Sequence, residues 1–120
     1  MSRVIGNRAE DRAARFLETR GYTIIERNFR CARGEIDIIA EHEGVLCFVE
    51  VRMRQTGRYG LPEESISHLK KRKIAITARH FLAQRHIEDK ACRFDVVTIV
   101  GEGEPVLQAN AYEQYVYKDQ

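Results

Sequence analysis

The chain has 120 residues, of which 43% are hydrophobic and 32% are charged, and its formal net charge at pH 7 is +2. This length and composition fit one soluble globular domain over residues 1–120 and exclude a second domain of ordinary size. No apolar run approaches the ~20 residues of a membrane-spanning helix. The first residues contain no hydrophobic signal core, so we expect no membrane partner and a cytoplasmic location.

The first half of the chain changes from a helical pattern to extended ones. Apolar residues recur at helical spacing over 4–20, and Gly21 is a natural stop for that helix. The β-branched and aromatic run at 22–29 predicts a strand. Segments 34–40 and 45–52 predict two more strands, joined as a hairpin. The glycines and the proline that follow predict a loop over 53–62.

The second half adds a long helix and one or two strands. Ser67 can cap a helix that runs to about His86, and 93–100 predicts a strand buried on both faces. Residues 106–109 can form a short edge strand before a C-terminal tail at 110–120. The order α-β-β-β-α-β predicts an α/β sandwich with a central mixed sheet flanked by helices, because the strand after the long helix can join in parallel.

The cysteines give no sign of a disulfide or zinc site. They are odd in number and widely spaced, so we expect reduced thiols at Cys31, Cys47 and Cys92.

The predicted hairpin carries acidic residues where buried strands should be apolar. A two-residue turn at Glu43–Gly44 sets Asp37 opposite Glu50, and Glu35 opposite Arg52. Because side chains alternate along a strand, this register predicts one fully apolar face. That face holds Ile36, Ile38, Ala40, Cys47, Val49 and Val51.

Two directly opposed carboxylates destabilise a sheet unless a cation lies between them. The pair Asp37 and Glu50 therefore predicts either a bound metal ion or a salt-bridge network with Arg52 and Arg54. Glu35 would be either an additional metal ligand or a partner of Arg52. Mg²⁺ prefers oxygen ligands and usually takes one or two carboxylates. A divalent ion, Mg²⁺ or Mn²⁺, would support hydrolysis of a phosphodiester, with Arg52 placed to hold a phosphate oxygen.

Basic residues are concentrated in the second predicted helix. The segment from Ile66 to His86 contains six of them and no acidic residue. Lys70, Lys71 and Lys73 lie in its first turns, where a helix favours anions, so a bound phosphate would relieve the conflict. Arg54 and Arg58 in the adjacent loop could also contact phosphates. Nucleic-acid contact and a simply solvated helix face both remain open.

The spacing of an acid, about a dozen residues and then Glu-x-basic across a hairpin resembles the PD-(D/E)XK restriction-endonuclease superfamily. The wider pattern resembles the YraN-like bacterial family of predicted endonucleases, over nearly the whole chain. That pattern comprises Gly6 with Glu10, Gly21–Tyr22, Glu26–Arg30, Gly34–Asp37, Phe48–Arg52, Glu64–Ile66 with Lys70, Arg93–Val97 and Asn110–Tyr112.

The resemblance implies a fold similar to the archaeal Holliday-junction resolvases, which are Mg²⁺-dependent dimeric nucleases acting on branched DNA. Their functional positions correspond to Glu10, Asp37, Glu50 and Arg52 here. The superfamily usually has Lys at the last position. Because Arg stays charged and cannot act as a base, water activation would need another group, and Lys70, Lys71 or Lys73 are candidates.

The expectation is therefore a metal-dependent endonuclease acting on DNA, including structured or branched DNA, with a homodimer suggested by analogy alone. Two alternatives stay open. One is a non-catalytic nucleic-acid-binding module of the same fold, in which Arg52 marks a site that has lost activity. The other is a protein-interaction domain that binds neither metal nor DNA.

Overall fold

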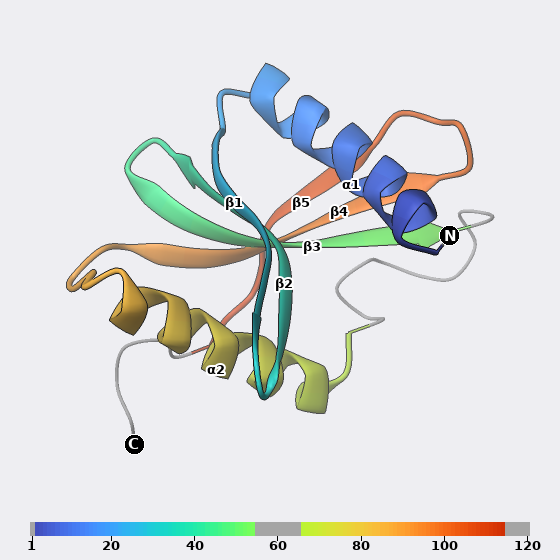
Figure 1. The fold of residues 1–120 in the computed structure, drawn as a ribbon. Coiled ribbons are helices and arrows are strands. Elements are labelled where there is room, and N and C mark those ends of the chain that lie inside the picture. The colour runs from blue at the N-terminus through green and yellow to red at the C-terminus, as the bar shows by residue number, and fades with distance from the viewer. Residues whose placement is uncertain (1, 55–65, 115–120) are drawn as a thin grey trace.

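The fold is an α/β sandwich built on one mixed sheet (Figure 1). A computed structural model of the chain describes residues 2–54 and 66–114. In order along the chain, its elements are α1 (Ser2–Thr19), β1 (Thr23–Cys31), β2 (Gly34–His42), β3 (Val45–Arg54), α2 (His68–Gln84), β4 (Cys92–Val100) and β5 (Val106–Tyr112).

The five strands lie in the order β1-β2-β3-β4-β5. Neighbours are antiparallel except β3 and β4, which are parallel because α2 carries the chain back across the sheet between them. The expected fold class and the parallel joining of the strand after the long helix are both confirmed. The central run of β4, residues 96–99, is buried, as its β-branched and largely apolar sequence predicts.

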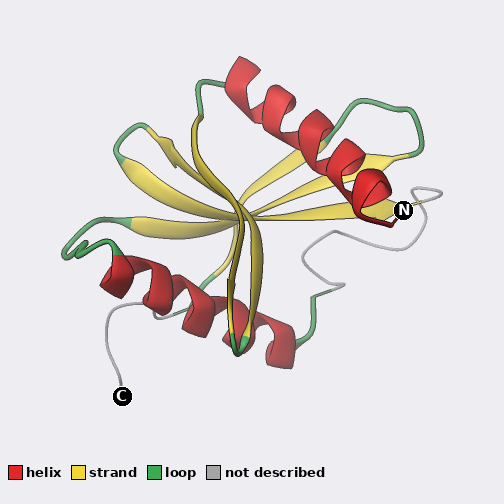
Figure 2. Cartoon of the chain, viewed as in Figure 1, coloured by secondary structure: helices red, strands yellow, loops and turns green. Residues whose placement is uncertain are grey.

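The two helices cover opposite faces of the sheet (Figure 2). The α1 face buries a cluster that includes Leu17 and Val97, and the α2 face buries a second cluster that includes Phe81 and Phe94. The expected alternation holds for Ile38, which joins the α1 cluster, and for its neighbour Ile39, which joins the α2 cluster.

Both helix-end signals in the sequence are confirmed. Gly21 has a φ of +90°, and the Gly21 and Tyr22 amides donate to the carbonyl oxygens of Glu18 and Leu17, which closes α1 with a Schellman motif. Ser67 caps α2, because its side-chain oxygen accepts a hydrogen bond from the Lys70 amide at 3.1 Å.

The prediction of a single apolar hairpin face is wrong at one position. Ile36 packs in the α2 cluster with its strand partner Phe29, although Ile38 packs in the α1 cluster. The cause is twist in the β1–β2 hairpin, which runs across the other strands toward α2 (Figure 1). In β1, Asn28 interrupts the extended backbone with a φ of 57°, so the alternation does not carry through this part of the hairpin.

The C-terminal strand is longer than expected. β5 continues to Tyr112, so residues 110–112 belong to the sheet and not to a tail. Part of the loop expected over 53–62 is strand, because Met53 and Arg54 complete β3, and the rest lies outside the described residues. All three cysteines are free thiols. In the described ranges, neither helix has the length and apolar character needed to cross a membrane.

Candidate metal centre

A gap between two strands organises the candidate site. β2 and β3 pair from His42 and Val45 at the turn to Ile38 and Val49, which is the register that the sequence predicts. Beyond this pair Asp37 Oδ2 accepts a hydrogen bond of 2.8 Å from the amide of Val51. A carboxylate thus takes the place of a main-chain acceptor where the strands part.

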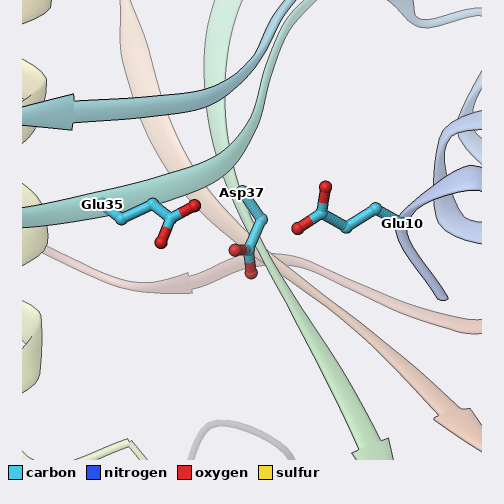
Figure 3. A group of neighbouring side chains, drawn as sticks. All are labelled: Glu10, Glu35 and Asp37. Carbon is cyan, nitrogen blue, oxygen red and sulfur yellow. The ribbon is translucent and has the colours of Figure 1, made fainter. Parts of the chain in front are cut away.

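Three carboxylates converge at this gap. Glu35 and Asp37 extend from the same strand, and Glu10 reaches them from α1, as Figure 3 shows. One oxygen from each lies within 4.8 Å of the other two. β2 supplies Glu35 and Asp37, and the position of α1 over the sheet brings Glu10 to them.

The environment of Asp37 disfavours a negative charge. Burial, followed by the charge of Glu50, raises the pKa of Asp37 from 3.8 to about 7, and Glu10 and Glu35 add to the rise. The hydrogen bond from the Val51 amide acts in the opposite direction but is outweighed. Near neutral pH this carboxyl therefore exchanges its proton readily, and a cation placed beside it would favour the ionised form.

Glu50 lies next to this group but is held by cations. Its side chain is only 10% exposed, and its Oε2 accepts a hydrogen bond of 2.6 Å from Lys70 Nζ, which α2 supplies. Arg52 Nη1 lies 4.0 Å from the same oxygen. Lys70 therefore contacts the Glu50 carboxylate, and a role for it in water activation stays a prediction.

The remaining carboxylates have cationic neighbours of their own. Arg30 Nε lies 3.3 Å from Glu35 Oε2, whereas the sequence suggested Arg52 as the Glu35 partner. Arg27 Nη2 lies 3.5 Å from Glu10 Oε1. The predicted salt-bridge network is therefore present at Glu50, which pairs with Arg52. The contacts of Asp37 described above are instead with the Val51 amide and other carboxylates.

The other basic residues proposed for phosphate contact are dispersed. Lys71 Nζ lies 4.9 Å above the ring of Tyr112, which itself stacks on Phe94 in the core. Lys73 lines a cavity beside Glu35, described below. Arg54 ends β3, and Arg58 lies outside the described residues.

The donor set suits a hard divalent cation. Carboxylate oxygens are the ligands that Mg²⁺ and Mn²⁺ prefer. Within the part of the chain that the structure describes, the buried Glu10 Oε1 atom has no hydrogen-bond partner, and its ion pair with Arg27 is long at 3.5 Å. Such an oxygen has a lone pair that a metal ion or its water shell could use.

Three other motifs of the sequence, Gly21–Tyr22, Arg93–Val97 and Asn110–Tyr112, form a buried polar network apart from this site. Asp95, with 0% exposure, accepts hydrogen bonds from Tyr22 Oη at 2.9 Å, Arg93 Nε at 3.1 Å and the Asn110 amide at 2.8 Å. Arg93 also donates to Tyr22 Oη at 2.7 Å. This network fixes β4, the start of β1 and the bulged end of β5 to one another, so its role is structural.

The sequence left two interpretations of Glu35 open, an additional metal ligand and a partner of Arg52, and the structure places it with Glu10 and Asp37. The proximity of Lys70 to Glu50 depended on how α2 crosses the sheet, which no local pattern specifies.

The fold and the carboxylate cluster define an α/β domain with an acidic centre where two strands of its sheet diverge. Residues 9–99 match the model of a family described as "Uncharacterised protein family UPF0102". The chain therefore belongs to the UPF0102 family, which confirms the family-level part of the sequence resemblance.

Its relatives cover most of the chain. A UPF0102 protein of Persephonella marina is 52% identical over 95 residues, which is 79% of this chain and 82% of that protein. One of Myxococcus xanthus is 42% identical over 102 residues, covering 85% and 81%. One of Lachnoclostridium phytofermentans is 44% identical over 114 residues, covering 94% and 96%.

Proposed function

We propose that this protein is a metal-dependent phosphodiester hydrolase that cleaves DNA internally, with structured or branched DNA in its substrate range. The observation that carries the proposal is the convergence of Glu10, Glu35 and Asp37 at the gap between β2 and β3. The mutual repulsion of three clustered carboxyl groups opposes folding and contributes to the raised pKa of Asp37, which is typical of functional sites.

Asp37 is the central ligand in this proposal. Glu10 and Glu35 contribute oxygens directly or through water. Glu50 lies beside them and accepts a hydrogen bond from Lys70. When bound, Mg²⁺ or Mn²⁺ would lower the pKa of a coordinated water and neutralise charge on the phosphate. Since Mg²⁺ usually keeps several waters in protein sites, not every carboxylate needs to touch the ion.

Two cations have separate roles beside the carboxylates. Lys70 holds Glu50 in place through their 2.6 Å hydrogen bond. The Arg52 guanidinium lies 4.0 Å from Glu50 Oε2, so the two form an ion pair. The planar guanidinium of Arg52 is also suited to holding a phosphate oxygen. Arg52 cannot accept a proton from water, so the proposal assigns it no role as a base.

A cleavage assay tests the proposal. Linear, nicked, single-stranded and junction DNA would be incubated with the protein in Mg²⁺, in Mn²⁺ and in chelator. We expect metal-dependent cleavage that Asp37→Ala and Glu50→Ala abolish, while Asp11→Ala, an exposed carboxylate paired with Arg27, retains it. Cleavage that persists in both site variants would mean that the site is elsewhere.

A non-catalytic nucleic-acid-binding module is the second candidate. The observation that favours it is the occupation of Glu50 by Lys70 together with Arg52 at the usual Lys position. This alternative predicts salt-sensitive DNA binding without cleavage of any of the four substrates. A homodimer stays a prediction from analogy.

A further inference from the structure

A cavity of about 350 Å³ lies directly beside the carboxylate cluster. It is enclosed by the tip of the β1–β2 hairpin and the first turns of α2, and its lining residues are Gly34, Glu35, Ser67, Leu69, Lys70, Lys73 and Ile74. Glu35 belongs to the carboxylate cluster, and Lys70 contacts Glu50. The cavity and the candidate metal centre are therefore neighbouring parts of one surface.

The hairpin tip forms its wall because residue 34 has no side chain. A Cβ at Gly34 would lie 3.1 Å from Thr77 Oγ1 and 3.5 Å from Lys73 Cβ. The absence of that atom lets the hairpin approach α2 closely and brings Glu35 opposite the lysines of the helix.

The lining combines an apolar part with a cationic part. Leu69 is 61% exposed and offers an apolar surface for a flat group, while Ile74 beneath it is 4% exposed and belongs to the core. Lys70 and Lys73 supply positive charge. The one carboxylate of the lining, Glu35, is accompanied by Arg30 at 3.3 Å.

An unpaired nucleotide has the matching chemistry, since it joins a flat base to an anionic phosphate. The cavity volume is at the lower end of the range of about 300–1,000 Å³ for small-molecule sites, which suits a ligand of the size of a single nucleotide. Enzymes that admit a single base commonly hold it between apolar side chains.

We propose that this cavity binds one unpaired nucleotide of the DNA strand, adjacent to the phosphate at the carboxylate cluster. The inference rests on the proposed function and narrows its substrate class to single-stranded or frayed DNA, such as the unpaired positions of a branched molecule. A fully paired duplex cannot fill the cavity without unpairing a base.

Binding without metal tests this inference separately from catalysis. Fluorescence anisotropy in chelator would compare a short labelled single strand with a blunt duplex of the same sequence, for the parent, Leu69→Ala and the control Val106→Ala. Val106 is also exposed, at 55%, but lies on β5 outside the cavity lining. We expect the parent to prefer the single strand, and Leu69→Ala to lose about tenfold of that affinity with duplex binding unchanged.

The outcome separates the two proposals. Equal losses for single strand and duplex in Leu69→Ala, no loss, or a parent that prefers duplex would overturn the nucleotide cavity. None of these results would affect metal-dependent cleavage, which the Asp37 and Glu50 variants test. Conversely, selective loss of single-strand binding in a protein that cleaves nothing would support the cavity while the hydrolase proposal fails.

Discussion

Replacing Asp37 with Asn should stabilise the metal-free protein at neutral and alkaline pH and leave its stability unchanged in acid. The folded protein raises the pKa of this carboxyl from 3.8 to about 7, so ionising it costs more in the folded state than in the unfolded state. Stability of the parent is therefore lost as pH rises between these two values. Asn cannot ionise, yet its side-chain oxygen can still accept the 2.8 Å hydrogen bond from Val51.

The size of the effect follows from the pKa shift. About three pKa units at about 1.36 kcal/mol each give an upper limit of about 4 kcal/mol. The shift is shared with neighbouring carboxylates that can take up protons themselves, and the site is only partly shielded from solvent. We therefore expect a gain of about 1–2 kcal/mol above about pH 7.5, which is about 4–8 °C in melting temperature for a domain of this size.

The assay is thermal unfolding in chelator across a series of pH values, with Asp11→Asn as the matched control. Asp11 Oδ1 forms a 2.8 Å ion pair with Arg27 and its side chain is 46% exposed, so its replacement should change stability little and should not stabilise. Parallel pH curves for the parent and Asp37→Asn, or a destabilised variant near pH 8, would refute the reasoning.

Three further substitutions test other contacts by urea unfolding. Lys70→Met should lower stability by about 1–2 kcal/mol, because it leaves the Glu50 carboxylate, 10% exposed, without its closest cation. Asp95→Asn should cost about 3–5 kcal/mol, since the buried carboxylate accepts from Tyr22 and from a guanidinium that would lose its counter-charge. Gly21→Ala should cost about 1 kcal/mol, because a φ of +90° strains any residue with a Cβ.

For each of these three substitutions, one result would contradict the expected change in stability. Lys90→Met removes a pair with Glu41 in which both side chains are at least 32% exposed, so a loss as large as that of Lys70→Met would contradict the argument from burial. Asp95→Asn with near-parent stability would show that the network is not essential to the core. An unchanged free energy of unfolding in Gly21→Ala would mean that the end of α1 tolerates the strain.

Local signals were sufficient for most of the fold. The alternation of side chains between the two faces of each strand, together with the turn at Glu43–Gly44, predicts the hairpin register that the structure has. Gly21 and Ser67 likewise mark helix ends through their own backbone chemistry. These features depend on neighbours in the sequence, so the sequence specifies them.

Features that depend on twist or on distant contacts were not predictable in this way. Ile36 changes face because the hairpin twists, and β5 extends past Ala109 because the Asn110 amide bonds to Asp95 across the bulge. The candidate site likewise contains residues that local sequence patterns predict and residues that only tertiary packing brings together. Asp37 and Glu35 could be chosen from the hairpin pattern, whereas the approach of Glu10 was fixed by the packing of α1.

The most direct test of the central claim is calorimetric titration of the parent, Asp37→Asn and Asp11→Asn with Mg²⁺ and with Mn²⁺. The account predicts saturable binding to the parent and to Asp11→Asn near neutral pH, with proton release as Asp37 ionises. It predicts binding that is about tenfold weaker or undetectable in Asp37→Asn. No binding by the parent, or equal binding by all three proteins, would contradict a metal centre at this cluster.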